Sequence, residues 1–265
     1  MLNVKFTNIS PSAFQTQPKI QPSPKNITSN YQSEKIIPFK GNIDFVLVNK
    51  CAQKLPINKE FKHIEDVLKT IGVTELELGD NIGLARLLKS AMCRVKKMGF
   101  EVPKKIICDA KFFKNDPEIQ ALTKEMSKKL GITDVSVPAH VRWDSINEPI
   151  MYFNPEKNWN DSRAFLSNTK DLRYSIWHET GHYLHIKNFK NNPNEFWKLT
   201  QKQLSEYQQG IVRESIGKYA ADTTVAETIA ETFSRLMSGE SYSKLHPEVF
   251  YIYNKYNGPM PKLKV

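Results

Sequence analysis

The stretch His178-Glu179-Thr180-Gly181-His182 decides how this chain of 265 residues folds. It spells H-E-x-x-H, and on an α-helix positions i and i+4 share one face, so both imidazoles can bind the same metal ion. The glutamate beside the first histidine can then reach a water molecule at that ion. The spacing predicts a metal site on a helix, with His178 and His182 as ligands and Glu179 as a general base.

The residues on both sides of the motif have a helical pattern. Apolar residues recur before and after it, and Pro193 ends the pattern. They are Leu172, Ile176, Trp177, Tyr183, Leu184 and Ile186. The motif therefore lies within a helix of ordinary length. A surface helix that happens to carry two histidines is the alternative.

Gly181 is unusual because glycine inside a helix costs about 1 kcal/mol relative to alanine. Its presence indicates that something packs closely over this turn, and a second backbone approaching the metal-bearing face would explain it. A tolerated glycine without a role is the alternative.

A catalytic zinc site usually has three protein ligands and one open position for water. His185 lies on the same helical face as His178 and His182, but nearly a full turn further along. Three ligands from one straight helix cannot surround an ion. We therefore expect His185 to support the ligands from behind or to line the cleft.

A better third ligand lies in the predicted helix 225–238, where Glu227 follows His182 by 45 residues. Glu227 and Glu231 are one turn apart on a common face, and like charges at this spacing repel by about a few tenths of a kcal/mol. A cation beside them removes the repulsion. Glu227 can then bind the metal while Glu231 accepts a hydrogen bond from a ligand histidine.

Two other interpretations of these glutamates stay open. Thr224-x-x-Glu227 fits a capping box, in which threonine caps the helix and the glutamate reaches back to the threonine amide. Glu231 fits equally well as a solvated surface residue.

These residues resemble the glutamate-liganded zincins (gluzincins), and more narrowly the anthrax lethal factor-like toxin metallopeptidases. The shared features are the H-E-x-G-H helix from His178 to His182 and a downstream helix that reads E-x-x-A-E-x-F from Glu227 to Phe233. The resemblance covers residues 170–240 and says nothing about the substrate.

The resemblance implies one catalytic Zn²⁺ ion held by His178, His182 and Glu227, with Glu231 as an outer support. It also implies a tyrosine whose hydroxyl stabilises the reaction intermediate, and Tyr219 is the nearest match, one residue further from the ligand glutamate than in the family. The implied activity is zinc-dependent hydrolysis of peptide bonds in a protein or peptide substrate. A role as a toxin or effector is a further implication.

The rest of the chain predicts an α+β fold, with a small mixed or antiparallel sheet followed by the metal-binding helix and a C-terminal helical part. Strands before a metal helix and a glutamate helix follow the zincin order. Helices are expected over 58–98, 116–130, 194–208, 211–217, 225–238 and 245–254, and strands over 104–113, 135–143 and 149–154, the last two as an antiparallel hairpin.

The strand 149–154 is the candidate edge of this sheet. An extended substrate can add to a free edge as another strand, so Met151, Tyr152 and Phe153 are the candidate substrate-binding residues. An ordinary buried strand is the alternative.

Residues 1–40 differ in composition from the remainder. They are rich in proline, serine, asparagine, glutamine and threonine, and the first acidic residue is Glu34, which predicts a disordered tail before a catalytic domain over 41–265. No apolar segment typical of a signal peptide follows Met1. Three scattered cysteines favour a reducing compartment, so a cytoplasmic location is expected, with non-classical export as the alternative.

The chain carries a formal net charge of +10 and a mean hydropathy of −0.50. No apolar run is long enough for a transmembrane helix. Lysine pairs without a nucleic-acid motif favour solvated surfaces, although acidic partners or nucleic acid stay an alternative. Two rival functions follow, a catalytically inert zincin-fold interaction module and a nucleic-acid-associated metalloprotease. No feature of the sequence indicates an oligomeric state.

Overall fold

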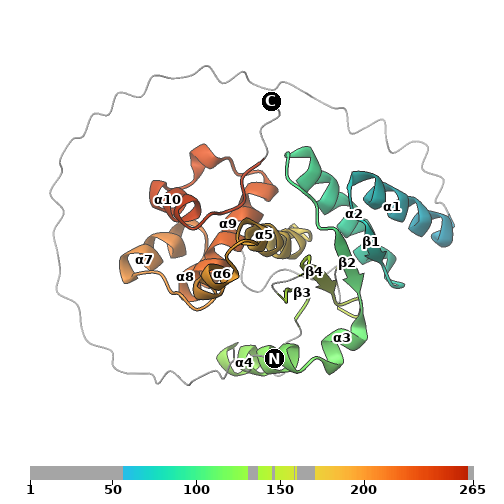
Figure 1. Cartoon of the computed structure of the whole chain (residues 1–265), viewed down its shortest axis with the longest axis horizontal. Coiled ribbons are helices and arrows are strands. Elements are labelled where there is room, and N and C mark those ends of the chain that lie inside the picture. The colour runs from blue at the N-terminus through green and yellow to red at the C-terminus, as the bar shows by residue number, and fades with distance from the viewer. Residues whose placement is uncertain (1–55, 131–136, 145–146, 158, 160–170, 262–265) are drawn as a thin grey trace, which may run out of the picture. The chain divides into compact units, whose positions relative to one another are not determined.

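A computed structural model describes residues 56–130, 137–144, 147–157, 159 and 171–261 (Figure 1). All of them belong to one compact unit. The predicted tail over 1–40 lies outside the described residues, and so does part of the predicted strand 135–143. Among the helices of the described part, none has the length and apolar character needed to cross a membrane.

The first helices are α1 (Ile57–Ile71) and α2 (Ile82–Lys97), as the helical pattern of 58–98 predicts, and they pack against each other. Gly72 ends α1 with a φ of 120°, a backbone conformation that glycine adopts without strain. The Asn81 side chain accepts a hydrogen bond from the Leu84 amide at 2.9 Å and caps α2. The chain between the two helices contains the short strand β1 (Glu75–Glu77), which the sequence pattern does not predict.

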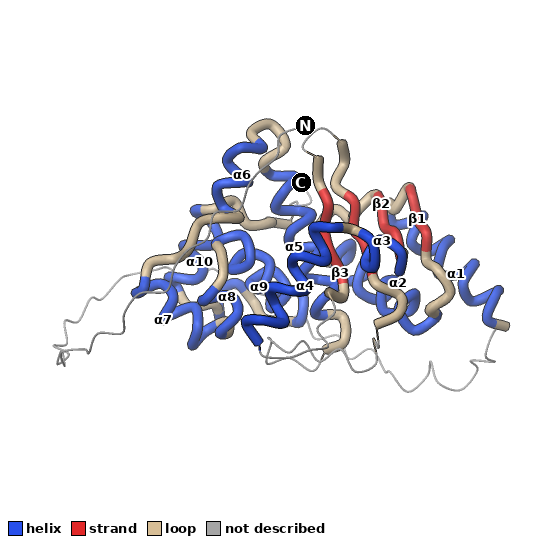
Figure 2. Tube along the Cα trace, turned by 90° about the horizontal axis from the view of Figure 1, so that it is seen from below, coloured by secondary structure: helices blue, strands red, loops and turns tan. Residues whose placement is uncertain are grey.

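The sheet contains three further strands, β2 (Lys105–Cys108), β3 (Ala139–Arg142) and β4 (Ile150–Phe153). The strand order is β1-β2-β4-β3, with β1, β2 and β4 parallel and β3 antiparallel to β4. The described sheet is therefore mixed, and the predicted antiparallel pairing of β3 with β4 is confirmed. Figure 2 shows the strands side by side.

The expectation that 149–154 forms a sheet edge is wrong. Met151 of β4 pairs with Ile106 of β2 on one side and with Val141 of β3 on the other, so β3 and β1 are the edges of the described sheet. Met151 and Phe153 are fully buried. The alternative interpretation, an ordinary buried strand, describes β4 correctly, because β4 pairs on both sides.

The two faces of the sheet are covered by different helices. Alternate residues of β4 point to opposite faces, and Met151 and Phe153 join the main core with residues of α2 and of α5 (Tyr174–Asn188). On the other face, Tyr152 stacks on Phe112 of α3 (Ala110–Asn115) with ring centroids 3.8 Å apart. A smaller core lies there, to which α4 (Pro117–Leu130) contributes the buried Ile119.

The C-terminal part is helical, as predicted, and α9 spans the predicted residues 225–238, but the other helices have different boundaries. Its elements are α6 (Pro193–Leu199), α7 (Glu206–Ser215), α8 (Lys218–Asp222), α9 (Val225–Ser238), a 3₁₀ turn (Tyr242–Lys244) and α10 (Pro247–Lys255). The expected helix 194–208 is two helices, because Ser205 and Gln208 form a capping box that begins α7. The expected helix 211–217 is therefore the end of α7, and α8 follows Gly217.

Helix α5 packs extensively on α9 and also contacts α2, β3 and β4. The Trp177 indole of α5 is fully buried and donates a hydrogen bond to the carbonyl of Ala91 in α2 at 3.3 Å. Arg94 of α2 donates a hydrogen bond to the carbonyl of Met237 near the end of α9. Contacts from α2 thus hold both helices that carry the candidate ligands.

Candidate metal centre

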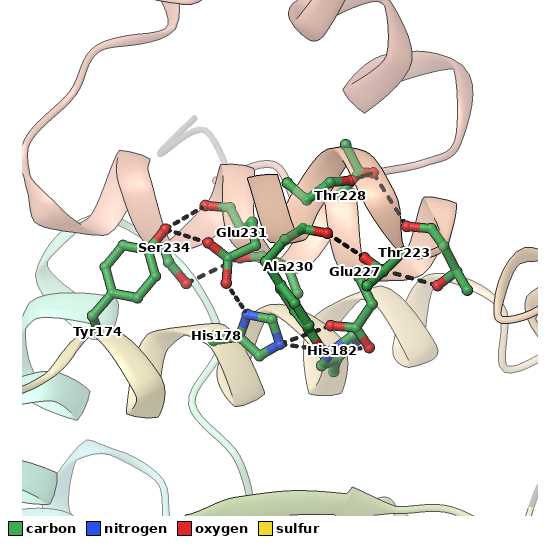
Figure 3. A network of polar contacts seen from close by, with 12 residues as sticks. Tyr174, His178, His182, Thr223, Glu227, Thr228, Ala230, Glu231 and Ser234 are labelled. Atoms are coloured by element: carbon green, nitrogen blue, oxygen red, sulfur yellow. Dashed lines mark hydrogen bonds and ion pairs between the residues drawn. The ribbon is translucent and has the colours of Figure 1, made fainter. Parts of the chain in front are cut away.

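Three side chains from α5 and α9 converge on one point, His178, His182 and Glu227 (Figure 3). The Nε2 atoms of the two histidines lie 3.1 Å apart. Glu227 Oε2 lies 3.1 Å from His178 Nε2, and Glu227 Oε1 lies 3.3 Å from His182 Nε2. The predicted meeting of the two helices is therefore confirmed, and this group can hold a metal ion.

The spacing of these atoms fits a tetrahedral ion. Zinc binds histidine nitrogen and carboxylate oxygen at about 2.0 to 2.2 Å, which puts neighbouring ligand atoms of a tetrahedron about 3.3 to 3.6 Å apart, slightly more than the separations here. The three measured separations are 3.1, 3.1 and 3.3 Å. Each histidine nitrogen therefore faces a different oxygen of the Glu227 carboxylate, and the three side chains enclose a space of the size that one small ion requires.

The Glu227 carboxylate gives a second test of the fit. Its Oε2 atom is buried and, within the described part of the chain, has no hydrogen bond of regular geometry, although His178 Nε2 is close. A buried carboxylate oxygen is costly unless hydrogen bonds or a cation satisfy it. The donor set and this oxygen therefore fit a bound cation.

Gly181 explains how the two helices approach so closely. A Cβ atom at this position would lie 3.0 Å from the Ala230 Cα and 3.2 Å from the Phe233 Cβ of α9. Any larger side chain would push the helices apart. The predicted approach of a second backbone over this turn is confirmed, and the alternative of a glycine without a role is wrong.

The capping-box interpretation of Glu227 describes only half of what the structure shows. The Thr224 side chain accepts a hydrogen bond from the Glu227 amide at 3.4 Å and caps α9. The Glu227 side chain points instead to the two histidines. Threonine therefore begins the helix while the glutamate side chain is left for the candidate site.

Glu231 is buried, with 6% of its surface exposed, so the interpretation as a solvated surface residue is wrong. Its Oε1 atom lies 2.8 Å from His178 Nδ1. Its Oε2 atom accepts a hydrogen bond from the Tyr174 hydroxyl at 2.7 Å. The predicted contact between Glu231 and a histidine of the motif is confirmed.

The charges of the cluster shift the pKa of its members. Burial alone lowers the pKa of His178, but Glu227 and Glu231 outweigh it and hold that pKa well above its ordinary value. Burial raises the pKa of the Glu227 carboxyl, and the nearby His182 and His178 hold it well below its usual range. Protons and a metal ion therefore compete for the same nitrogen.

Tyr219 of α8 lies beside the candidate ligands, and Glu179 follows the first of them in α5. The Tyr219 ring is 6.1 Å from the His178 ring, and the Glu227 carboxylate acts electrostatically on its hydroxyl. Burial, followed by the Glu227 carboxylate, holds the pKa of Tyr219 well above its ordinary value, so the hydroxyl is a proton donor. Glu179 is partly exposed, next to His178 in the chain.

The expectation for His185 is wrong. It is fully buried among aromatic residues, with its ring 5.3 Å from Phe189 and 5.5 Å from Phe196. Its Nε2 atom is 2.7 Å from the Tyr256 carbonyl, and burial lowers the pKa of His185 to about 4. His185 therefore neither lines a cleft nor supports a ligand, because the last turns of α5 face the aromatic core.

Tyr174 is the residue of this cluster that the sequence analysis missed. It is 3% exposed, and burial followed by Glu231 raises the pKa of its hydroxyl. A signal was available, because Tyr174 precedes His178 by four residues and so shares its helical face.

Comparison of this chain with models of known protein families, with curated proteins and with solved structures gives no match.

Proposed function

We propose that this protein is a zinc-dependent endopeptidase of the glutamate-liganded zincin class, similar to the anthrax lethal factor-like toxin metallopeptidases. The observation that carries the proposal is the group of His178 Nε2, His182 Nε2 and the Glu227 carboxylate. Imidazole and carboxylate are ligands that zinc accepts, and three of them leave a position for water.

The chemistry follows from the residues around that position. A zinc ion bound here would lower the pKa of a water molecule and polarise the carbonyl of a peptide bond. Glu179 takes a proton from the attacking water and returns it to the leaving amine. Its place next to His178 in the motif, and its partial exposure, suit a group that must meet both substrate and solvent.

Tyr219 is the residue proposed to stabilise the developing negative charge on the carbonyl oxygen. Its hydroxyl is protonated, lies beside Glu227 and comes from a third helix, α8. A hydroxyl aimed at the place where charge develops lowers the barrier more than it stabilises the substrate.

The substrate itself is proposed to pair with β3 instead of β4. An extended peptide adds to a free edge, and β3 is an edge strand of the described sheet that also packs on α5. Met151, Tyr152 and Phe153 then act one strand away from the substrate, by holding β3 in place.

The proposal is tested by metal analysis together with proteolysis. Protein freed of metal is loaded with zinc and with other divalent ions, and bound metal is measured beside cleavage of a denatured protein mixture. We expect one zinc per chain and cleavage that a chelator abolishes. Glu179→Gln should keep its zinc and lose about 100-fold or more of the activity, the usual contribution of a general base.

Glu214→Gln is the matched control, because Glu214 is an exposed glutamate of α7. It should keep both zinc and activity. A Glu179→Gln variant with normal turnover would refute the role of Glu179. Zinc binding without cleavage by the wild-type protein would instead favour the inert interaction module.

A further inference from the structure

We propose that Tyr174 is a positioning residue of the candidate metal centre, whose hydroxyl holds the Glu231 carboxylate in the orientation that prepares His178 for metal binding. The inference rests on the metal site of the proposed function. It adds to that site a residue that lies outside the H-E-x-x-H motif.

The contacts form a continuous chain from Tyr174 to His178 (Figure 3). Tyr174 is the first residue of α5 and lies one turn before His178 on the same face. Its hydroxyl donates to Glu231 Oε2 at 2.7 Å, while Glu231 Oε1 lies 2.8 Å from His178 Nδ1. Each oxygen of a single carboxylate thus faces one of the two α5 side chains.

Burial protects these contacts from competition by water. Tyr174 and Glu231 are 3% and 6% exposed, so bulk water does not compete effectively for their hydrogen bonds. Removing one partner of a buried polar pair leaves the other partner without a hydrogen bond, which costs more than the net value of the bond. The Tyr174 hydroxyl therefore restricts rotation of the Glu231 side chain, whose other oxygen lies 2.8 Å from His178 Nδ1.

The orientation of Glu231 determines which nitrogen of His178 is free. A neutral imidazole has one nitrogen that donates and one that accepts. A carboxylate oxygen 2.8 Å from Nδ1 favours the tautomer with its hydrogen on Nδ1, so that Nε2 keeps its lone pair for a metal. Nε2 is the atom that faces His182 and Glu227. Without Tyr174, Glu231 can rotate and this tautomer is held less firmly.

The experiment compares two tyrosines of the same helix. Tyr174→Phe removes the hydroxyl that contacts Glu231. Tyr183→Phe, the matched control, removes a buried hydroxyl that donates to the Glu148 carboxylate and accepts from the Lys104 amide at 3.2 Å. Zinc affinity is measured by competition with a chromophoric chelator, and thermal unfolding is followed on metal-free protein. We expect Tyr174→Phe to weaken zinc binding about tenfold, the lower end of the effect of removing an outer partner of a ligand.

Tyr183→Phe should keep the wild-type zinc affinity even where its metal-free form unfolds at a lower temperature. A merely structural role for Tyr174 would weaken zinc binding no more than Tyr183→Phe does at equal loss of stability. Wild-type affinity in Tyr174→Phe, or an equal loss in Tyr183→Phe, would overturn the proposal.

A double variant tests whether Tyr174 acts through Glu231. In the Glu231→Ala background the tyrosine has no carboxylate to hold, so Tyr174→Phe should weaken zinc binding little further. An additional loss as large as in the wild-type background would contradict the mechanism. These results can be told apart from a failure of the proposed function, because a wild-type protein that binds no zinc refutes the metal site. Normal zinc affinity in Tyr174→Phe refutes only the role of Tyr174.

Discussion

The first part of helix α5, residues 174–182, and the second part, residues 183–188, are here called its two halves. Both contain tyrosine and histidine, but these residues have different surroundings in each half. The first half has Tyr174, His178 and His182, and the side chains of Tyr174 and His178 meet carboxylates of α9. The second half has Tyr183 and His185, and there the histidine meets a backbone carbonyl and aromatic rings. Nearby acids raise the pKa of His178 well above normal, whereas burial lowers that of His185.

The difference shows that the residues packed against a histidine determine whether it is a candidate metal ligand. Tyr174 pairs with Glu231, whereas His182, later in α5, pairs with Glu227, earlier in α9. The two helices therefore run in opposite directions here. His185, further along α5, meets the Tyr256 carbonyl instead. Four predictions follow from this contrast, from the largest expected effect to the smallest.

The largest effect is expected from the carboxylate that faces the first half of α5. Glu227→Gln should weaken zinc binding by more than about 100-fold, beyond the range for outer partners, since it removes a proposed ligand. Glu148→Gln is the matched control, because Glu148 contacts Tyr183 and Lys187 in the second half. Chelator competition measures both. If both variants lose zinc affinity equally, the two halves of α5 do not differ in metal binding.

The second effect is a pH dependence that arises from His185. Its pKa is lowered to about 4 in the folded protein, so between that pH and about 6.5 the unfolded chain binds a proton that the folded chain does not. Stability is therefore lost as the pH falls through this window, by up to about 3 kcal/mol. His185→Gln should flatten this part of the profile, measured by denaturant unfolding of metal-free protein at several pH values.

His63→Gln serves as the control for that series, because His63 lies on the exposed face of α1. It should reproduce the wild-type profile. If His185→Gln retains the full slope, the loss of stability in acid comes from other groups.

A third test concerns the contact that brings α9 to the first half of α5. Gly181→Ala should destabilise the protein by about 1 to 3 kcal/mol, because the added methyl group meets the Ala230 backbone. Unfolding in denaturant measures this loss. Zinc affinity should fall as well, since the two helices must move apart.

The smallest effect is the matched change at Gly210, inside α7, where a Cβ would meet no atom within 4 Å. Gly210→Ala should stabilise the protein by about 0.5 to 1 kcal/mol through helix propensity alone. The same denaturant measurement applies. A loss of stability here as large as that of Gly181→Ala would show that close packing is not what distinguishes Gly181.

Spacing within one helix accounts for what could be predicted from the sequence. His178 and His182 share a face at i and i+4, and so do Glu227 and Glu231, which made the geometry of the candidate site predictable. The packing role of Gly181 was predictable because glycine is unfavourable inside a helix. These inferences need only the period of the helix and the free-energy cost of a glycine inside it.

Features that depend on contacts distant in sequence were not predictable. Strand β4 is internal because it lies between β2 and β3. Its side chains alternate between the two faces of the sheet, as they would in an edge strand, so the sequence pattern does not distinguish the two positions. His185 has the spacing of a ligand-face residue, but Tyr256 and Phe196 determine its surroundings. Strand β1 has only three residues, two of them charged and exposed, which is too short for a periodic pattern.

The separation of the candidate ligands along the chain has a consequence for resistance to proteolysis. His182 and Glu227 are 45 residues apart, so an ion bound by both would act as a removable cross-link that closes the loop containing α6, α7 and α8. Such a link disfavours the open chain by reducing its conformational entropy. Chelation should therefore expose this segment to proteases before it affects the sheet.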